Sequence, residues 1–88
     1  GHSGYAEAGA DIVCAAVSTA VKFAEHTICE VLGEHAKTRV HEEDARVTLT
    51  LPAVCEDEDA VQAVLTGMML TLCELRDAYP DYIEVLEV

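Results

Sequence analysis

Apolar side chains recur every three or four residues along the first third of this 88-residue chain. Between Asp11 and Leu32 they form a single stripe of helical spacing, and Gly33 follows where helices commonly end. The stripe consists of Val13, Val17, Ala20, Val21, Ala24, Ile28, Val31 and Leu32. The pattern predicts an amphipathic helix that begins at Asp11, a good N-cap residue, and ends at Gly33.

The pattern changes to alternation after Gly33. Over 45–51 apolar and polar residues alternate strictly, which is typical of a strand with one buried face. A shorter alternating run over 36–41 precedes it, and the acidic residues 42–44 separate the two. We expect 36–41 and 45–51 to form an antiparallel hairpin with 42–44 as its turn. The favoured interpretation of 42–44 is a solvated turn, and the alternative is a docking patch for a partner.

Helical spacing returns after Pro52. The acidic residues 56–59 favour a helix start, because negative charge is stabilising there, and Pro80 marks the end. Gly67 interrupts the apolar pattern at a cost of about 1 kcal/mol relative to alanine, which predicts that another element packs closely against it. Residues 82–88 alternate again and are interpreted as a last strand.

The order helix, hairpin, helix, strand indicates an α+β fold, with two helices packed on one face of a small antiparallel-rich sheet. Residues 1–88 make a single domain. Tryptophan is absent and aromatic residues are 5% of the chain, so the core is built from aliphatic side chains. Oligomerisation is a common way for so small a domain to bury more surface.

Seventeen acidic residues stand against five basic ones, which gives a formal charge of −12. Such a surface repels phosphates and argues against direct binding of nucleic acid. It suits a basic protein or peptide partner, although acidity that only keeps a domain soluble is the more frequent case.

The four cysteines, at positions 14, 29, 55 and 73, lie mostly in or beside apolar helical patterns, where a free thiol is at home. No signal peptide is visible, and no apolar run approaches the roughly 20 residues of a membrane span. We therefore expect a cytoplasmic protein with reduced thiols and no membrane partner.

One cysteine lies where chemistry is favoured. With Asp11 as N-cap, Cys14 falls in the first helical turn, where the positive helix end favours a thiolate. His2 is the nearest imidazole, and the segment between them contains Gly4 and Gly9, so it is flexible enough to fold the histidine over the cysteine. This is the outline of a cysteine–histidine nucleophile. An ordinary packed thiol and a histidine left from a purification tag are the alternatives.

His26 and Cys29 are three residues apart on the first predicted helix, a spacing that suits two zinc ligands. Further ligands would have to come from His35 or His41, and no CxxC or HxxxH pair accompanies them. We expect no metal and no cofactor.

The opening segment GHSGYAEAGADIVCAAVS resembles the signature of the ribosomal-processing cysteine protease family (Prp), in which a Gly-His stretch precedes an Asp-Ile-Val-Cys-Ala helix start. The matching residues are Gly1, His2, Gly4, Asp11, Ile12, Val13, Cys14, Ala15 and Ser18. Since members of this family begin with a strand pair, the resemblance implies about 15–25 further residues before Gly1.

The resemblance implies a cysteine endopeptidase with His2 and Cys14 as its catalytic pair. A serine accompanies the cysteine in this family, here Ser18, although a hydroxyl bonded back to its own helix is an equal alternative. Asp11 caps the helix and is also a candidate to orient His2. The residues from Gly1 to Ala10, with glycines at 1, 4 and 9, would be a mobile loop that orders on substrate.

The substrate implied by the resemblance is the N-terminal extension of a large-subunit ribosomal protein, removed before ribosome assembly. A homodimer is implied as well. Two other functions remain open: a ribosome-associated binding module without catalysis, and a metal or thiol regulatory domain that uses His26 and Cys29.

Overall fold

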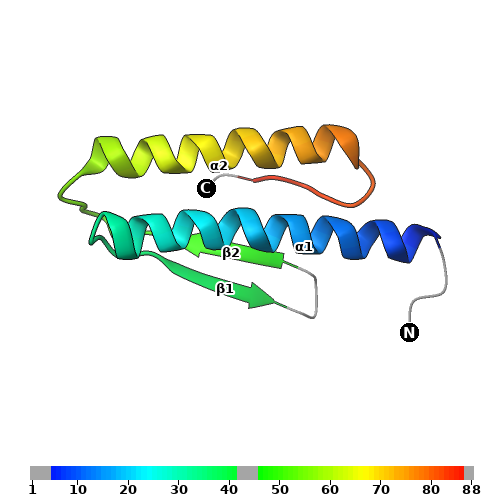
Figure 1. Cartoon of the computed structure of the whole chain (residues 1–88), viewed down its shortest axis with the longest axis horizontal. Coiled ribbons are helices and arrows are strands. Elements are labelled where there is room, and N and C mark those ends of the chain that lie inside the picture. The colour runs from blue at the N-terminus through cyan, green and yellow to red at the C-terminus, as the bar shows by residue number, and fades with distance from the viewer. Residues whose placement is uncertain (1–4, 42–45, 87–88) are drawn as a thin grey trace.

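A computed structural model describes residues 5–41 and 46–86. Its elements in chain order are α1 (Tyr5–His26), the π-helical turn η1 (Thr27–Val31), β1 (Lys37–His41), β2 (Arg46–Thr50) and α2 (Glu58–Ala78). The two helices run side by side in opposite directions, and the hairpin lies along α1 (Figure 1). The α+β class predicted from the sequence is confirmed.

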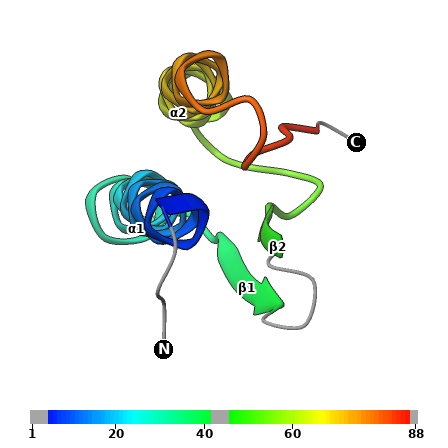
Figure 2. The same ribbon diagram turned by 90° about the vertical axis from the view of Figure 1, so that its right-hand side faces the viewer.

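The central element is α1. It contacts both strands and α2, whereas α2 contacts α1 and η1 but neither strand. An end-on view shows this arrangement, with α2 and the hairpin on different sides of α1 (Figure 2). Of the two helices, only α1 packs directly on the sheet.

The predicted hairpin is confirmed. β1 and β2 pair antiparallel with Lys37 opposite Thr50 and Val40 opposite Val47. Side chains alternate between the two faces. One face carries the half-buried residues Thr38, Val47 and Leu49, together with Val40, which stays exposed, and the other carries Lys37, Arg39, Arg46, Thr48 and Thr50, all exposed. The predicted turn 42–44 lies outside the described residues.

The predicted end of the first helix is also confirmed, with one refinement. Its last turn widens into η1, where the Leu32 N–H donates to the Thr27 carbonyl at 3.0 Å. Gly33 follows with φ at +69°, a left-handed conformation that glycine adopts without a side-chain clash.

The predicted start of that helix at Asp11 is wrong, because α1 begins at Tyr5. The sequence over 5–10 is YAEAGA, and alanine and glutamate are strong helix formers that give the helix no reason to stop. Asp11 therefore lies inside α1 and does not cap it. Gly9, predicted to be a loop hinge, lies inside the same helix.

The start of α2 agrees with its prediction. Asp57 is the N-cap, and its Oδ1 accepts a hydrogen bond from the Ala60 N–H at 3.2 Å. The Asp57 N–H in turn donates to Glu34 Oε2 at 2.6 Å, which ties the segment just after η1 to the start of α2. The helix ends at Ala78, just before Pro80, as predicted.

The predicted last strand is wrong within the residues described, since 83–86 have no regular structure. After α2 the chain turns at Tyr82, whose N–H donates to the Tyr79 carbonyl at 3.1 Å. It then runs back on the hairpin's side of the helices (Figures 1 and 2). A strand needs a ladder partner, and β1 and β2 pair only with each other.

The predicted close contact at Gly67 is wrong as well. A Cβ built on Gly67 meets nothing within 4 Å, so this glycine faces open space. The close contact in the fold occurs at Gly9, where a Cβ would stand 3.2 Å from Cε2 of Tyr82. The ring of Tyr82 therefore lies directly on the backbone of α1.

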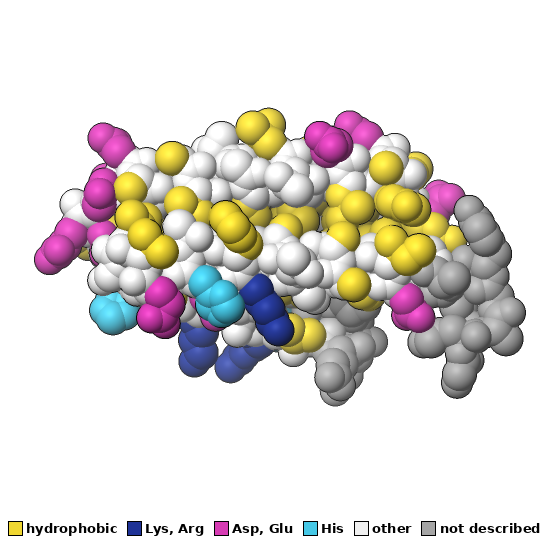
Figure 3. Space-filling view, in the orientation of Figure 1, with side chains coloured by type: hydrophobic (Ala, Val, Ile, Leu, Met, Phe, Trp, Pro, Cys, Tyr) yellow, Lys and Arg dark blue, Asp and Glu magenta, His cyan; other side chains and the backbone are white. Residues whose placement is uncertain are grey.

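The core is small and lies mainly along α1. Its buried side chains are Val13, Val21, Ala24, Ile28, Val61 and Leu72. Apolar side chains also gather along the seam between α1 and α2 on the face shown in Figure 3. Phe23 and Leu70 are 72% and 68% exposed.

One expectation about apolar runs is corrected. The segment Gly9–Val31 is long and apolar enough to cross a membrane by length and composition. In the structure it is the central helix of the fold, and its buried residues Val13, Val21, Ala24 and Ile28 face the other elements. Those four residues are its packing face, whereas 22% of the apolar window is buried and most of the segment lies at the surface of the described structure.

Candidate active site

Cys14 lies in the third turn of α1, on an exposed part of the helix surface. Only the first four N–H groups of a helix lack an intrahelical partner, and the field of the helix end falls off within the first turn. The predicted position of Cys14 in the first turn is therefore wrong for this conformation. Its backbone N–H is engaged inside the helix and is not available to hold an oxyanion.

The structure does bring three predicted site residues to one side of α1. Cys14 follows Asp11 by three residues and precedes Ser18 by four, and both spacings place side chains on the same helix face. Asp11 is exposed and Ser18 is half-buried. His2, with Gly1 and Gly4, lies outside the described residues, so its pairing with Cys14 stays a prediction.

Cys14 is the exposed member of the four cysteines. Cys29, Cys55 and Cys73 are half-buried, and all four thiols are free of disulfide bonds. The Cys29 thiol donates to the Ala36 carbonyl at 3.4 Å. Partial burial, and then the carboxylates of Glu34 and Glu58, raise the pKa of the Cys55 thiol. Accessibility therefore singles out Cys14 as the candidate nucleophile.

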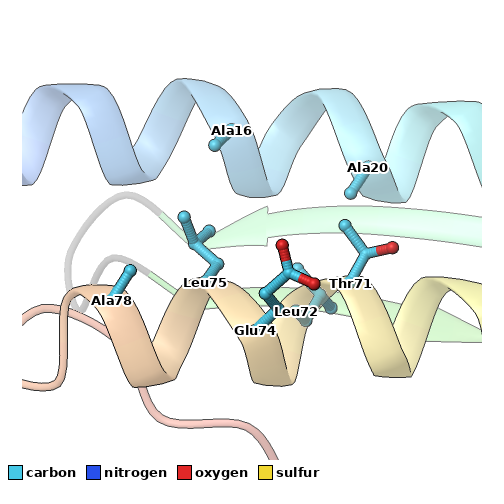
Figure 4. Close-up of a pocket in the computed structure, with 7 residues that line it drawn as sticks. All are labelled: Ala16, Ala20, Thr71, Leu72, Glu74, Leu75 and Ala78. Carbon is cyan, nitrogen blue, oxygen red and sulfur yellow. The ribbon is translucent and has the colours of Figure 1, made fainter.

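A pocket of about 210 Å³ lies between the two helices (Figure 4). Its lining residues are Ala16, Ala20, Thr71, Leu72, Glu74, Leu75 and Ala78. Ala16 follows Cys14 by two residues, which on a helix points it to nearly the opposite side. The pocket therefore does not surround Cys14, and we do not assign it to the candidate active site.

The histidine and cysteine proposed as zinc ligands do not belong to a metal cluster in the described part of the chain. There, no group of three or more His, Cys, Asp or Glu residues lies close enough to hold an ion. His26 is exposed, as expected for the polar side of α1.

Tyr82 has a contact with α1 that the sequence does not predict. The alternation over 82–88 makes it the first residue of a strand, yet its ring lies against Gly9 of α1. The available signal was Gly9 itself, since a glycine inside a helix marks a close approach of another element.

Comparison with protein families gives one clear match. A family model described as cysteine protease Prp matches residues 1–84, which include His2, Asp11, Cys14 and Ser18. Searches of curated proteins and of solved structures found no match.

Proposed function

Because the chain belongs to the Prp family of cysteine proteases, we propose that it is an endopeptidase with Cys14 as its nucleophile. The observation that carries this assignment is the exposure of Cys14, while the other three thiols are half-buried. Its position on the central helix gives the nucleophile a rigid support, which catalytic geometry requires.

In the proposed mechanism the Cys14 thiolate attacks the scissile carbonyl and forms a tetrahedral intermediate. His2 takes the thiol proton and returns it to the departing amine, which leaves an acyl-enzyme that water then hydrolyses. The role of His2 rests on the Gly-His match to the family. Asp11 would orient the imidazole, and Ser18 lies beside the nucleophile on the same helix face.

The proposed substrate is the N-terminal extension of a large-subunit ribosomal protein, which makes this a ribosome-processing enzyme. The formal charge of −12 supports a basic partner, because an acidic surface speeds the approach of a basic protein. The same charge makes nucleic acid an unfavourable partner. Four free thiols support a reducing compartment, and we propose the cytoplasm.

We also propose that the protein is a homodimer. The small core and the exposed apolar side chains beside the α1–α2 seam support this (Figure 3). Phe23→Glu is expected to reduce the mass measured by light scattering from two chains to one. Lys22→Glu changes the neighbouring exposed residue and serves as the control. A wild-type mass of one chain would refute the homodimer.

The test of the enzyme is cleavage of a peptide that spans the ribosomal-protein extension, analysed by mass spectrometry. We expect one cut, lost by about a thousandfold or more in Cys14→Ala and nearly lost in His2→Ala. Cys29→Ala changes a half-buried thiol and should leave cleavage intact. Cleavage that survives Cys14→Ala would end the mechanism.

A second function is a ribosome-associated binding module without catalysis. The observation that favours it is the position of Cys14 in the third turn, where the helix end does not activate a thiol. Iodoacetamide distinguishes the two functions. An enzyme requires Cys14 to react much faster than an ordinary exposed thiol near neutral pH, and a binding module does not.

A further inference from the structure

The pocket between the two helices lies where the side chains of α1 are small. Ala16 and Ala20 face the gap, and their methyl groups fill little of it, so about 210 Å³ stays open (Figure 4). Leu72 is the buried member of the lining. Glu74 and Ala78 are exposed, so the pocket is open to solvent on their side.

Glu74 is the charged residue among those that line the pocket. Its carboxylate is turned toward the gap between the helices (Figure 4). Within the described part of the chain it makes no ion pair, and the nearby Arg76 lies 3.3 Å from Asp77 instead. The pocket therefore combines an apolar interior with one carboxylate that is available to a cation from outside.

A lysine side chain has the chemistry that matches this pocket. Its aliphatic stem gains from burial along apolar surface, while its ammonium group stays at the edge, beside water. Leu72 and Leu75 supply the apolar surface, and Glu74 supplies the negative charge where the ammonium would emerge. A neutral apolar side chain would leave the Glu74 carboxylate unused, and an acidic one would be repelled by it.

The surroundings of the pocket favour a lysine that belongs to a polypeptide. Ile12 precedes Ala16 by four residues and Leu70 precedes Glu74 by four, so each lies on the same helix face as a lining residue. Ile12 is 56% exposed and Leu70 is 68% exposed. Exposed apolar side chains around a pocket are typical of a surface that a protein partner covers. The formal charge of −12 selects a basic partner.

We propose that this pocket is a docking site for a lysine side chain of a basic polypeptide. Ala16 points to nearly the opposite side of α1 from Cys14, so a partner held here leaves the nucleophile accessible. A second point of attachment raises the local concentration of the rest of the partner. That the partner is the ribosomal-protein substrate rests on the proposed function, whereas the preference for lysine does not.

The first test measures binding of a fluorescein-labelled decapeptide of alternating lysine and alanine by fluorescence anisotropy. The protein carries Cys14→Ala, so that the peptide is not cut. Adding Glu74→Gln should weaken binding about three- to fivefold, as expected for one exposed ion pair. Glu30→Gln changes the net charge equally at an exposed residue outside the pocket, and it should leave the affinity nearly unchanged.

The second test fills the pocket. Ala16→Leu places a larger side chain in the gap and should weaken binding about tenfold, because the lysine stem loses its apolar contacts. Ala63→Leu makes the same change at an exposed position of α2 outside the pocket and serves as the control. If Ala16→Leu does not fold, as judged by circular dichroism, Ala78→Leu fills the pocket from α2 and replaces it.

The proposal is overturned if Glu74→Gln and Glu30→Gln weaken binding equally, since the peptide then responds only to overall charge. It is also overturned if a peptide with norleucine in place of lysine binds as tightly. A lower mass of Ala16→Leu in light scattering, with peptide binding unchanged, would assign the pocket to a contact between two copies and would equally overturn it.

The cleavage assay separates these outcomes from failure of the proposed function. Peptide binding that depends on Glu74, in a protein with intact Cys14 that cuts nothing, would support the docking site and refute the protease alone. Cleavage of the ribosomal-protein extension, with peptide binding indifferent to Glu74→Gln and Ala16→Leu, would refute the docking site alone.

Discussion

The two helices begin in different ways although each has an aspartate suited to cap it. Asp57 caps α2 and accepts a hydrogen bond from the Ala60 N–H, whereas Asp11 lies inside α1. The difference lies in the preceding residues. Pro52 and the irregular residues 53–55 prevent a helix before Asp57, while the alanine-rich stretch before Asp11 continues one.

A capping aspartate therefore marks the start of a helix only where the residues before it do not favour helix. Each of the two aspartates also has a cysteine near it in the sequence. Cys55 precedes the cap of α2 and is close to the carboxylates of Glu34 and Glu58, which raise the pKa of its thiol. Cys14 follows the aspartate of α1 and is exposed. The two thiols therefore differ in exposure, since Cys14 is exposed and Cys55 is half-buried.

The largest expected effect comes from proline at the two starts. Ile12→Pro should lower the free energy of unfolding by about 3 kcal/mol, because residue 12 is inside α1 and proline breaks a helix interior. Glu58→Pro occupies the first position of α2, where proline is accepted, and should cost less than about 0.5 kcal/mol. Urea unfolding followed by circular dichroism measures both. Equal losses of unfolding free energy in the two variants would contradict the difference between the two helix starts.

The cap of α2 gives the next effect. Asp57→Ala removes the acceptor for the Ala60 N–H and should lower the free energy of unfolding by about 1 kcal/mol. Asp57→Asn keeps an oxygen that can accept this bond and should restore most of the loss. The same unfolding assay applies, and an asparagine variant as weak as the alanine variant would show that the cap is not responsible.

The two helix glycines form a matched pair with a smaller effect. Gly67→Ala should raise the free energy of unfolding by about 0.5–1 kcal/mol, because its new methyl group meets nothing within 4 Å. Gly9→Ala should gain less, since its methyl group would press on the ring of Tyr82 at 3.2 Å. Thermal melts of the two variants compare them directly, and an equal gain would deny the ring contact.

The smallest effect concerns the pH dependence at Cys55. Its raised pKa means that the folded protein keeps the thiol protonated where the unfolded chain already ionises. This contribution to stability is complete below the ordinary thiol pKa and is lost as the pH rises through the raised value. Glu34→Gln should lower the pKa of Cys55 and speed its alkylation a few-fold in mildly alkaline buffer. An unchanged rate would exclude Glu34 as a cause.

Local patterns were sufficient to predict the α+β class, the hairpin, the glycine that ends α1 and both ends of α2. These features depend on residues adjacent in sequence, such as Asp57 with Ala60 or Gly33 after the last turn. The irregular segment 83–86 was not predictable in that way, because it follows the turn at Tyr82, whose ring packs on Gly9, and residues so far apart in sequence leave no periodic signal. The start of α1 has a local cause, since the helix-forming residues over 5–10 outweigh the capping preference of Asp11.

The candidate site also has one part that the sequence predicts and one part that it does not. Its members on α1 follow from helical spacing, which places Asp11, Cys14 and Ser18 on one face whichever residue begins the helix. The electrostatic state of the thiol does not follow, because it depends on how far the helix extends before Asp11. Spacing alone cannot reveal that length, since it is set by the helix preferences of residues 5–10.

The arrangement of α2 and the hairpin on separate sides of α1 also bears on how the protein could be divided. A cut between Leu51 and Pro52 would leave one piece with α1 and the hairpin and another with α2 and the returning tail. Since α2 touches α1 and η1 but neither strand, the two pieces would have to recognise each other through that helical surface, the hydrogen bond from Asp57 to Glu34 and the contact of Tyr82 with Gly9. In this sense α1 is the element that joins the hairpin to α2.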